Sequence, residues 1–145
     1  MGYNGSMASV FTRIIDGEIP GEFVWRDDRC VAFLSINPLH EGHTLVVPRD
    51  EVDHWVDLDE ATAAHLMQVA HRIGRVQQQV FGAARVGLMI AGFEVPHTHL
   101  HVLPIDGMAD LDFANAAAGP PDDFADVAER LRTALVDAGH AEASA

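Results

Sequence analysis

Apolar residues recur along this chain with two periods, one typical of helices and one typical of strands. Three segments show the helical period: a short one over residues 10–16, the longest over residues 57–81, and a last one over residues 124–135. Asp57 with Glu60 offers a capping signal at the start of the longest segment. A glycine follows each segment and can end the helix there: Gly17, Gly82 and Gly139.

Five further segments are short and either alternating or continuously apolar, which is typical of strands. The turn-prone pair Asp27-Asp28 joins the first two of them. In chain order they are residues 23–26, 30–36, 43–47, 86–90 and 97–103. Their connections suit hairpins better than parallel crossovers. The pattern therefore predicts an α+β fold, in which helices flank a five-stranded antiparallel sheet.

We expect one domain. Residues 1–6 are interpreted as the remnant of a cloning tag, with Met7 as the natural start. Residues 7–104 form the predicted core, and residues 105–145 add an acidic loop and the last helix to the same domain. The loop, residues 105–121, is rich in Asp, Ala and Gly. We expect a solvated spacer, while closure over a leaving group or a part in a dimer interface stays open.

The composition is that of a globular protein, with 48% hydrophobic and 21% charged residues. No apolar run approaches the roughly 18 residues that a membrane span needs. We therefore expect no membrane association and a cytoplasmic location. Cys30 is the only cysteine, which excludes intramolecular disulfides and cysteine-rich zinc sites. Our interpretation of Cys30 is a small buried strand residue.

The charge balance limits the class of partner. The formal net charge is −13, and the nine basic residues are all arginines. An acidic surface repels nucleic-acid polymers, so DNA and RNA are not expected partners. A small anionic ligand remains compatible with this charge, because local groups within about 8–10 Å decide its binding.

The segment Val95–Pro104 is the most informative in the chain. It places His97, His99 and His101 at alternate positions, and prolines lie near both ends. In an extended strand these side chains point to the same face, with Cα atoms about 6.6 Å apart. Three histidines in strict alternation are hard to explain as chance exposed positions on a half-buried strand. We interpret them as a site.

Two chemistries fit three aligned imidazoles. Three neutral rings can bind a transition metal and leave a position open for catalysis. Alternatively, one ring is a nucleophile while its neighbours supply hydrogen bonds, charge and protons. A histidine nucleophile suits phosphorus, and neighbouring imidazolium groups would stabilise a phosphoryl transition state. This second chemistry needs neither a metal nor a lysine.

The residues His97–Leu103 resemble the signature of the histidine-triad family, His-x-His-x-His-x-x with mostly apolar spacers. Three further segments agree with that family in order and spacing: Val10–Pro20, Asp27–Phe33 and Gly42–Pro48. The resemblance implies a nucleotide hydrolase or transferase built on an antiparallel sheet with helices, usually as a homodimer. It implies no cofactor.

The resemblance also implies roles for individual residues. His99 is the expected nucleophile on the α-phosphorus, and His97 and His43 are expected in the hydrogen-bonded chain that orients the site. His101 is expected to contact phosphate oxygens, and a histidine here, where the nucleotidyltransferase branch has glutamine, favours hydrolysis. The nucleoside is expected to lie against five apolar side chains, which could equally be ordinary core: Phe11, Ile14, Ile19, Phe33 and Ile36.

Four positions depart from the family pattern. Ser35 stands where relatives often hold the ribose hydroxyls with Asp or Asn, so weaker nucleoside binding is expected. Phe93 and Glu94 replace polar residues near the phosphates, and Glu94 would repel phosphate unless it is turned away. Glu51 replaces a histidine that ligates zinc in some bacterial relatives, and a cysteine pair near Phe11 is missing. We therefore expect no metal site.

We hypothesise hydrolysis at the α-phosphate of purine nucleoside 5′-phosphate derivatives through a nucleotidyl-histidine intermediate. The substrate is a nucleoside phosphoramidate or a dinucleoside polyphosphate, with a mild preference for the phosphoramidate. One alternative is a nucleotide-binding or interaction protein of the same fold with little turnover. A second alternative is a metalloenzyme that uses the three histidines as ligands.

Overall fold

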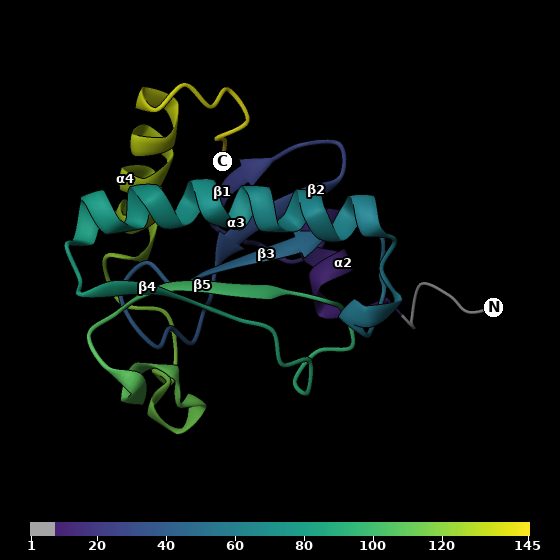
Figure 1. Ribbon diagram of the computed structural model, residues 1–145, viewed down its shortest axis with the longest axis horizontal. Helices are drawn as coiled ribbons and strands as arrows, with labels where there is room; N and C mark the ends of the chain where they lie inside the picture. Colours follow the sequence, from purple (N-terminus) through teal and green to yellow (C-terminus); the bar gives the residue numbers. More distant parts are fainter. Residues whose placement is uncertain (1–7) are drawn as a thin grey trace.

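The computed structural model describes residues 8–145 (Figure 1). In this part of the chain, five antiparallel strands form one sheet in the order β1-β2-β3-β5-β4. The predicted α+β fold is thereby confirmed. The strands are β1 (Phe23–Arg26), β2 (Cys30–Leu34), β3 (Thr44–Pro48), β4 (Arg85–Met89) and β5 (Leu100–Ile105). The predicted tag remnant at residues 1–6 and the start at Met7 lie outside the described residues.

Helices cover the two faces of the sheet unequally. Helices α3 (Glu60–Phe81) and α4 (Phe124–Asp137) pack over one face, and α3 runs along the sheet in Figure 1. The short helix α2 (Val10–Ile15) packs on the other face through Phe11, next to Phe33. Residues of β5 alternate between the two faces, so Leu100 joins the α3 core. His101, paired with Leu45 of β3, faces the α2 side.

Several predicted boundaries are wrong by a few residues. Helix α3 begins at Glu60, because Asp59, and not Asp57, accepts a hydrogen bond from the Thr62 backbone. Asp57 belongs instead to a 3-10 turn, η1 (Trp55–Asp57). Strand β2 ends at Leu34, where its partner β3 begins. The former strand candidate Ile36 is left 58% exposed.

The first hairpin confirms the predicted turn at residues 27–28. Both backbone N–H groups that follow it, of Arg29 and Cys30, donate to the Asp27 carboxylate. The indole of Trp25 and the ring of His65 also bond this carboxylate, at 2.8 and 2.7 Å. Burial would raise the pKa of Asp27, but these hydrogen bonds outweigh it and lower the pKa to about 2. Asp27 therefore ties the β1–β2 turn to α3.

A close approach at Gly42 positions the residue that follows it. Gly42 has φ +89°, and a Cβ there would lie 2.5 Å from the Phe81 ring. Only glycine meets both conditions without strain. Below this turn the buried Gln77 amide donates to the carbonyl oxygens of Gly42 and Val102 at 3.0 Å. The start of β3 is thus fixed to α3 and β5, which holds His43 in place.

Among residues 8–145, no helix has both the length and the apolar character that crossing a bilayer requires.

Candidate active site

The three alternating histidines lie on one side of the sheet, as predicted, but only His101 belongs to a strand. His97 and His99 precede β5, which begins at Leu100. Phe11 of α2 packs against both of their rings, with centroids 5.8 and 4.8 Å away. The rings of His99 and His101 are 4.8 Å apart. The prediction of a fully extended strand is wrong because the chain bends at residues 93–97.

His99 is held in one tautomer by its neighbour's backbone. Its Nδ1 donates to the carbonyl oxygen of His97 at 2.7 Å. In a neutral ring the proton is then on Nδ1, and Nε2 keeps a free lone pair. His99 lines two cavities. The arrangement therefore presents an unprotonated nitrogen to a ligand.

His43 and His101 form a directed pair. The Leu39 backbone N–H donates to His43 Nδ1 at 3.0 Å, which places the neutral ring's proton on Nε2. His43 Nε2 then donates to His101 Nδ1, also at 3.0 Å. The proton of His101 must consequently sit on Nε2. Since His101 also lines the larger cavity, this chain leaves an N–H donor next to the lone pair of His99.

The side chain of His97 contacts neither of the other two triad rings by a hydrogen bond. Its Nε2 donates to the Pro48 carbonyl oxygen at 2.8 Å, and its Nδ1 accepts from the Ser9 hydroxyl at 2.7 Å. His97 and His43 were expected in the hydrogen-bonded chain that orients the site; both make such bonds, but no hydrogen bond joins the ring of His97 to that of His43 or His101. Two separate sets of contacts therefore reach His99. The backbone carbonyl of His97 accepts its Nδ1 proton, and the ring of His101, which is hydrogen-bonded to His43, packs against its ring.

Glu51 anchors the branch that holds His97. It accepts hydrogen bonds from the Ser9 backbone N–H at 2.8 Å and from the Thr12 hydroxyl at 2.7 Å. The first of these is the main reason that the pKa of Glu51 is lowered. Sequence reasoning missed Ser9, although it caps α2 by accepting from the Thr12 N–H. A serine before the helical pattern was the available signal.

The four histidines are buried, and burial lowers the pKa of each. The pKa is about 4 for His43 and about 3 for His101, where neighbouring histidines add to the effect of burial. For His99 the hydrogen bond to His97 and the charge of Glu94 act in the opposite direction. All four rings are consequently neutral at pH 7, as a nucleophile requires.

Acid should destabilise this protein before its carboxylates protonate. Unfolded histidines titrate near pH 6.5, whereas folded His43 titrates near pH 4. The unfolded state binds more protons between these values, so stability present above pH 6.5 is lost as the pH falls toward 4. We expect a loss of about 3 kcal/mol from this histidine, measured by urea unfolding at pH 7.5 and 4.5. His43→Gln should reduce the difference, and His54→Gln, a control at an exposed position, should not; an equal reduction in both would contradict the assignment.

A cavity of about 280 Å³ opens between α2, β2 and the histidines. Six of the seven predicted substrate-binding residues line it: Phe11, Ile14, Phe33, Ser35, Ile36 and Glu94. Ile19 does not line it, although the next two residues, Pro20 and Gly21, do. Asn37 and Val95 line it as well and were not predicted. Neither residue has a sequence signal that separates it from an ordinary loop position.

The acidic loop closes one wall of this cavity. It contains two 3-10 turns, η2 (Met108–Leu111) and η3 (Phe113–Asn115). The Phe113 ring packs against His101 with centroids 5.1 Å apart, and Ala116 also lines the cavity. Most of the loop is exposed, as expected of a solvated spacer, but Phe113 and Ala116 contribute to the cavity wall. The signal in the sequence was a lone aromatic residue within a run of Asp and Ala.

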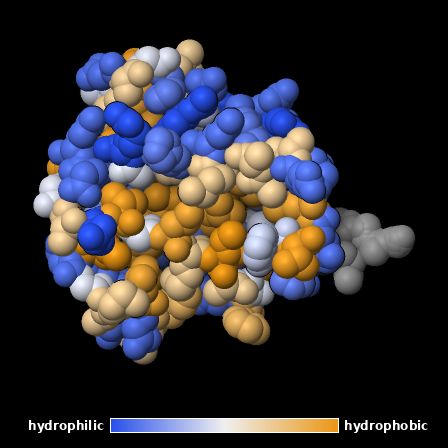
Figure 2. Space-filling view, in the orientation of Figure 1, coloured by the Kyte–Doolittle hydropathy of each residue, from blue (hydrophilic) through white to orange (hydrophobic). Residues whose placement is uncertain are grey.

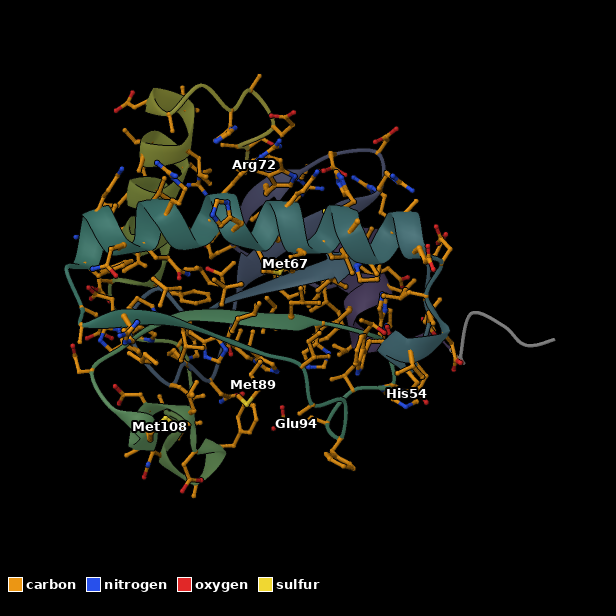
Figure 3. The ribbon with its side chains drawn as sticks, viewed as in Figure 1. His54, Met67, Arg72, Met89, Glu94 and Met108 are labelled. Atoms are coloured by element: carbon orange, nitrogen blue, oxygen red, sulfur yellow. The ribbon has the colours of Figure 1, made fainter. Side chains whose placement is uncertain are left out.

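Glu94 is not turned away from the site. One carboxylate oxygen lies within 4.8 Å of a ring nitrogen of both His99 and His101. Figure 3 shows Glu94 on the loop that joins β4 to β5. The neighbouring Phe93 is 97% exposed. A negative charge thus lies where an anionic ligand would approach the two rings.

The residues present do not favour a metal centre made of the three histidines. Both ring nitrogens of His97 are occupied by Ser9 and Pro48, and Nε2 of His101 carries its proton. A second compact group, Asp27 with Cys30 and His65, is joined by hydrogen bonds. Burial raises the pKa of the Cys30 thiol far above its usual range, which disfavours the thiolate that a metal needs.

Comparison with known proteins gives a consistent result. The model of the HIT domain family matches residues 16–108. An uncharacterized HIT-like protein of Borreliella burgdorferi is 35% identical over 66% of this chain and 73% of its own. The adenylylsulfatase HINT3 of Arabidopsis thaliana is 29% identical over 66% of this chain and 51% of its own. The crystal structure of a zinc-bound histidine-triad family protein from Mycobacterium smegmatis superposes with a TM-score of 0.78 at 28% identity, covering 92% and 97% of the two chains.

Proposed function

Because this chain belongs to the HIT domain family, we propose that it hydrolyses purine nucleoside 5′-phosphate derivatives at the α-phosphate, with His99 as the nucleophile. One observation carries the proposal. The free lone pair of His99 Nε2 and the N–H of His101 Nε2 lie side by side at the wall of one cavity. A nucleophile next to a donor for a phosphate oxygen is what displacement at phosphorus requires.

The proposed reaction has two displacements. His99 Nε2 attacks the α-phosphorus, a P–Nε2 bond forms, and the bond from phosphorus to the leaving group breaks. The leaving amine takes up one proton from solvent, and the water that attacks in the second step returns one proton to solvent. Water then attacks the same phosphorus, the P–Nε2 bond breaks, and His99 regains its lone pair. The balance is one water consumed, with the nucleoside monophosphate and the amine released. His101 would donate to the phosphoryl oxygen in both steps.

The cavity supports a purine nucleoside as the bound portion. Its wall combines the apolar side chains of Phe11, Ile14 and Phe33 with few polar groups, which is typical of small-molecule sites. Ser35 offers a hydroxyl, where a carboxylate would hold ribose more strongly. We therefore expect weaker nucleoside binding than a site with Asp would give.

The HIT family membership leaves a second candidate, a nucleotide-binding protein with little turnover. Glu94 beside His99 favours it, because the carboxylate would oppose the approach of an anionic phosphate. The release of amine from a phosphoramidate distinguishes the two functions. Calorimetry would show binding of adenosine monophosphate in both cases, but only the hydrolase would release amine. A three-histidine metalloenzyme would instead lose activity on chelation, and the occupied nitrogens of His97 disfavour it.

The direct test is to trap the intermediate. A fluorogenic amine joined to adenosine monophosphate would be mixed with the protein and quenched in acid-free denaturant within one turnover. We expect the intact mass to rise by one adenylyl group, and fragmentation to place it on His99. A productive hydrolysis that leaves no adduct on His99 at any quench time would contradict the proposal.

We also propose a homodimer formed along β4. This edge strand presents Leu88, which is 42% exposed, and Met67 of α3 beside it is 50% exposed. Figure 2 shows apolar surface across the middle of this face, over β4 and the adjoining side of α3. An unpaired edge with an apolar flank favours pairing with a second copy. Equilibrium sedimentation would give twice the chain mass, whereas a monomer at micromolar concentration would contradict this.

A further inference from the structure

A second cavity of about 280 Å³ adjoins the first at His99. Of the described residues that line the two cavities, His99 is the only one in common. We call the second one the distal cavity; the loop before η1 and the loop after β4 form it, with lining residues Asp53, His54, Trp55, Ile90, Ala91, Gly92, Phe93, Thr98 and His99. If the nucleoside fills the first cavity, a group attached to the phosphorus at His99 has the distal cavity open to it.

Two large aromatic side chains line the distal cavity without being packed into the core. Phe93 is 97% exposed and Trp55 is 46% exposed. Exposed aromatic rings on both walls of a cavity are suited to hold a flat or apolar group by stacking and burial. Sequence reasoning noted Phe93 only as a departure from a polar position, and it gave Trp55 no role.

Two carboxylates lie near His99, and His54 is a further titratable side chain that lines the distal cavity. Asp53 lies in the distal cavity, and the Glu94 carboxylate lies within 4.8 Å of nitrogens of His99 and His101. No arginine lines either cavity among the described residues, and the chain has no lysine. A polyphosphate leaving group would bring several negative charges here with no cationic side chain to pair with them. A leaving group with a positive charge would instead be attracted by both carboxylates.

We propose that the distal cavity, together with Glu94, is a leaving-group subsite that selects a cationic amine with a flat apolar body. This inference rests on the proposed function and narrows it, because it assigns nucleoside phosphoramidates as the substrate class and excludes dinucleoside polyphosphates. Figure 3 shows Glu94 and His54 on the two loops that border the subsite. A carboxylate at position 94 would repel phosphate, and in this proposal its role is to balance the positive charge of the amine.

The test compares three substrates that share adenosine monophosphate. The first carries 4-(aminomethyl)benzylamine through one nitrogen and keeps its second amine as an ammonium group. The second carries 4-methylbenzylamine, which has the same ring and no charge. The third is diadenosine tetraphosphate. We expect kcat/KM for the cationic amine to exceed that for the neutral amine by about tenfold, and that for the polyphosphate by about a hundredfold or more.

Variants identify the residues responsible. Glu94→Gln should reduce the preference for the cationic over the neutral amine to about twofold. Phe93→Ala combined with Trp55→Ala should raise KM for both amines. The control Asp126→Asn, on α4, removes one negative charge away from both cavities and should keep the wild-type preference.

The outcomes separate the two proposals. Hydrolysis of all three substrates without a charge preference, or a preference that Glu94→Gln leaves unchanged, overturns the subsite and leaves the proposed hydrolase intact. Efficient hydrolysis of the polyphosphate also overturns the subsite. Failure to hydrolyse any of the three substrates overturns the proposed function, and the inference with it.

Discussion

His99→Ala is expected to lower hydrolysis of an adenosine phosphoramidate by roughly 10⁴- to 10⁶-fold. The substitution removes the only ring nitrogen in the triad that has a free lone pair in its assigned tautomer. No other described histidine of the site can replace it, because His97 and His101 each use their second nitrogen as a donor. The measurement is the initial rate of amine release at saturating substrate, with the variant at high enzyme concentration.

Two controls distinguish loss of the nucleophile from loss of the fold. Calorimetry should show that His99→Ala still binds adenosine monophosphate, since the apolar wall of the cavity at Phe11 and Phe33 remains. Asp126→Ala, an exposed position on α4 that lines neither cavity, should keep full activity. A residual rate within tenfold of wild type in His99→Ala would contradict nucleophilic catalysis at this residue.

The sequence was sufficient for the elements whose signal is local. Strand β1 was predicted at its observed bounds, and the end of α3 followed from apolar spacing and Gly82, which has the left-handed conformation. The start of α3 was misplaced because Asp57 and Asp59 are equally good caps in a sequence. Only the path of the chain through η1 decides between them.

The histidines were identifiable from spacing, but their connections were not. Alternation correctly predicted that His97, His99 and His101 share a side of the sheet. It could not predict that the His97 ring bonds Ser9 and Pro48, since both partners come from segments more than 45 residues away. Hydrogen bonds between distant loops leave no period in the sequence.

The wall residues that could be predicted are apolar residues in elements with a clear periodic pattern. Phe11, Ile14 and Phe33 belong to elements with clear patterns, and all three line the cavity. Phe113 lies in a loop with no periodic pattern; its aromatic ring stands out among Asp and Ala, but the pattern does not identify His101 as the residue against which it packs. The same limit applies to Trp55, whose exposure is visible only once the fold is known.

The second large effect is expected from substitution of His101. Because His43 fixes the tautomer of His101, the two residues are best tested together. We expect His101→Ala to lower kcat by about 10²- to 10³-fold, because one donor to the phosphoryl oxygen is lost. His43→Ala should cost a similar factor, since His101 is then free to place its proton on Nδ1 and lose the donor at Nε2. His101→Gln keeps an N–H donor and should recover part of the rate.

The double variant decides whether the two residues act through one hydrogen bond. If His43 serves only to fix the tautomer of His101, removing both should cost no more than removing His101 alone, and the double-mutant cycle will show strong coupling. Urea unfolding of each variant at pH 7.5 would show whether it remains folded under assay conditions. Independent roles would instead multiply the two losses to at least about 10⁴-fold, and that outcome would mean that His43 acts on the reaction by a route other than His101.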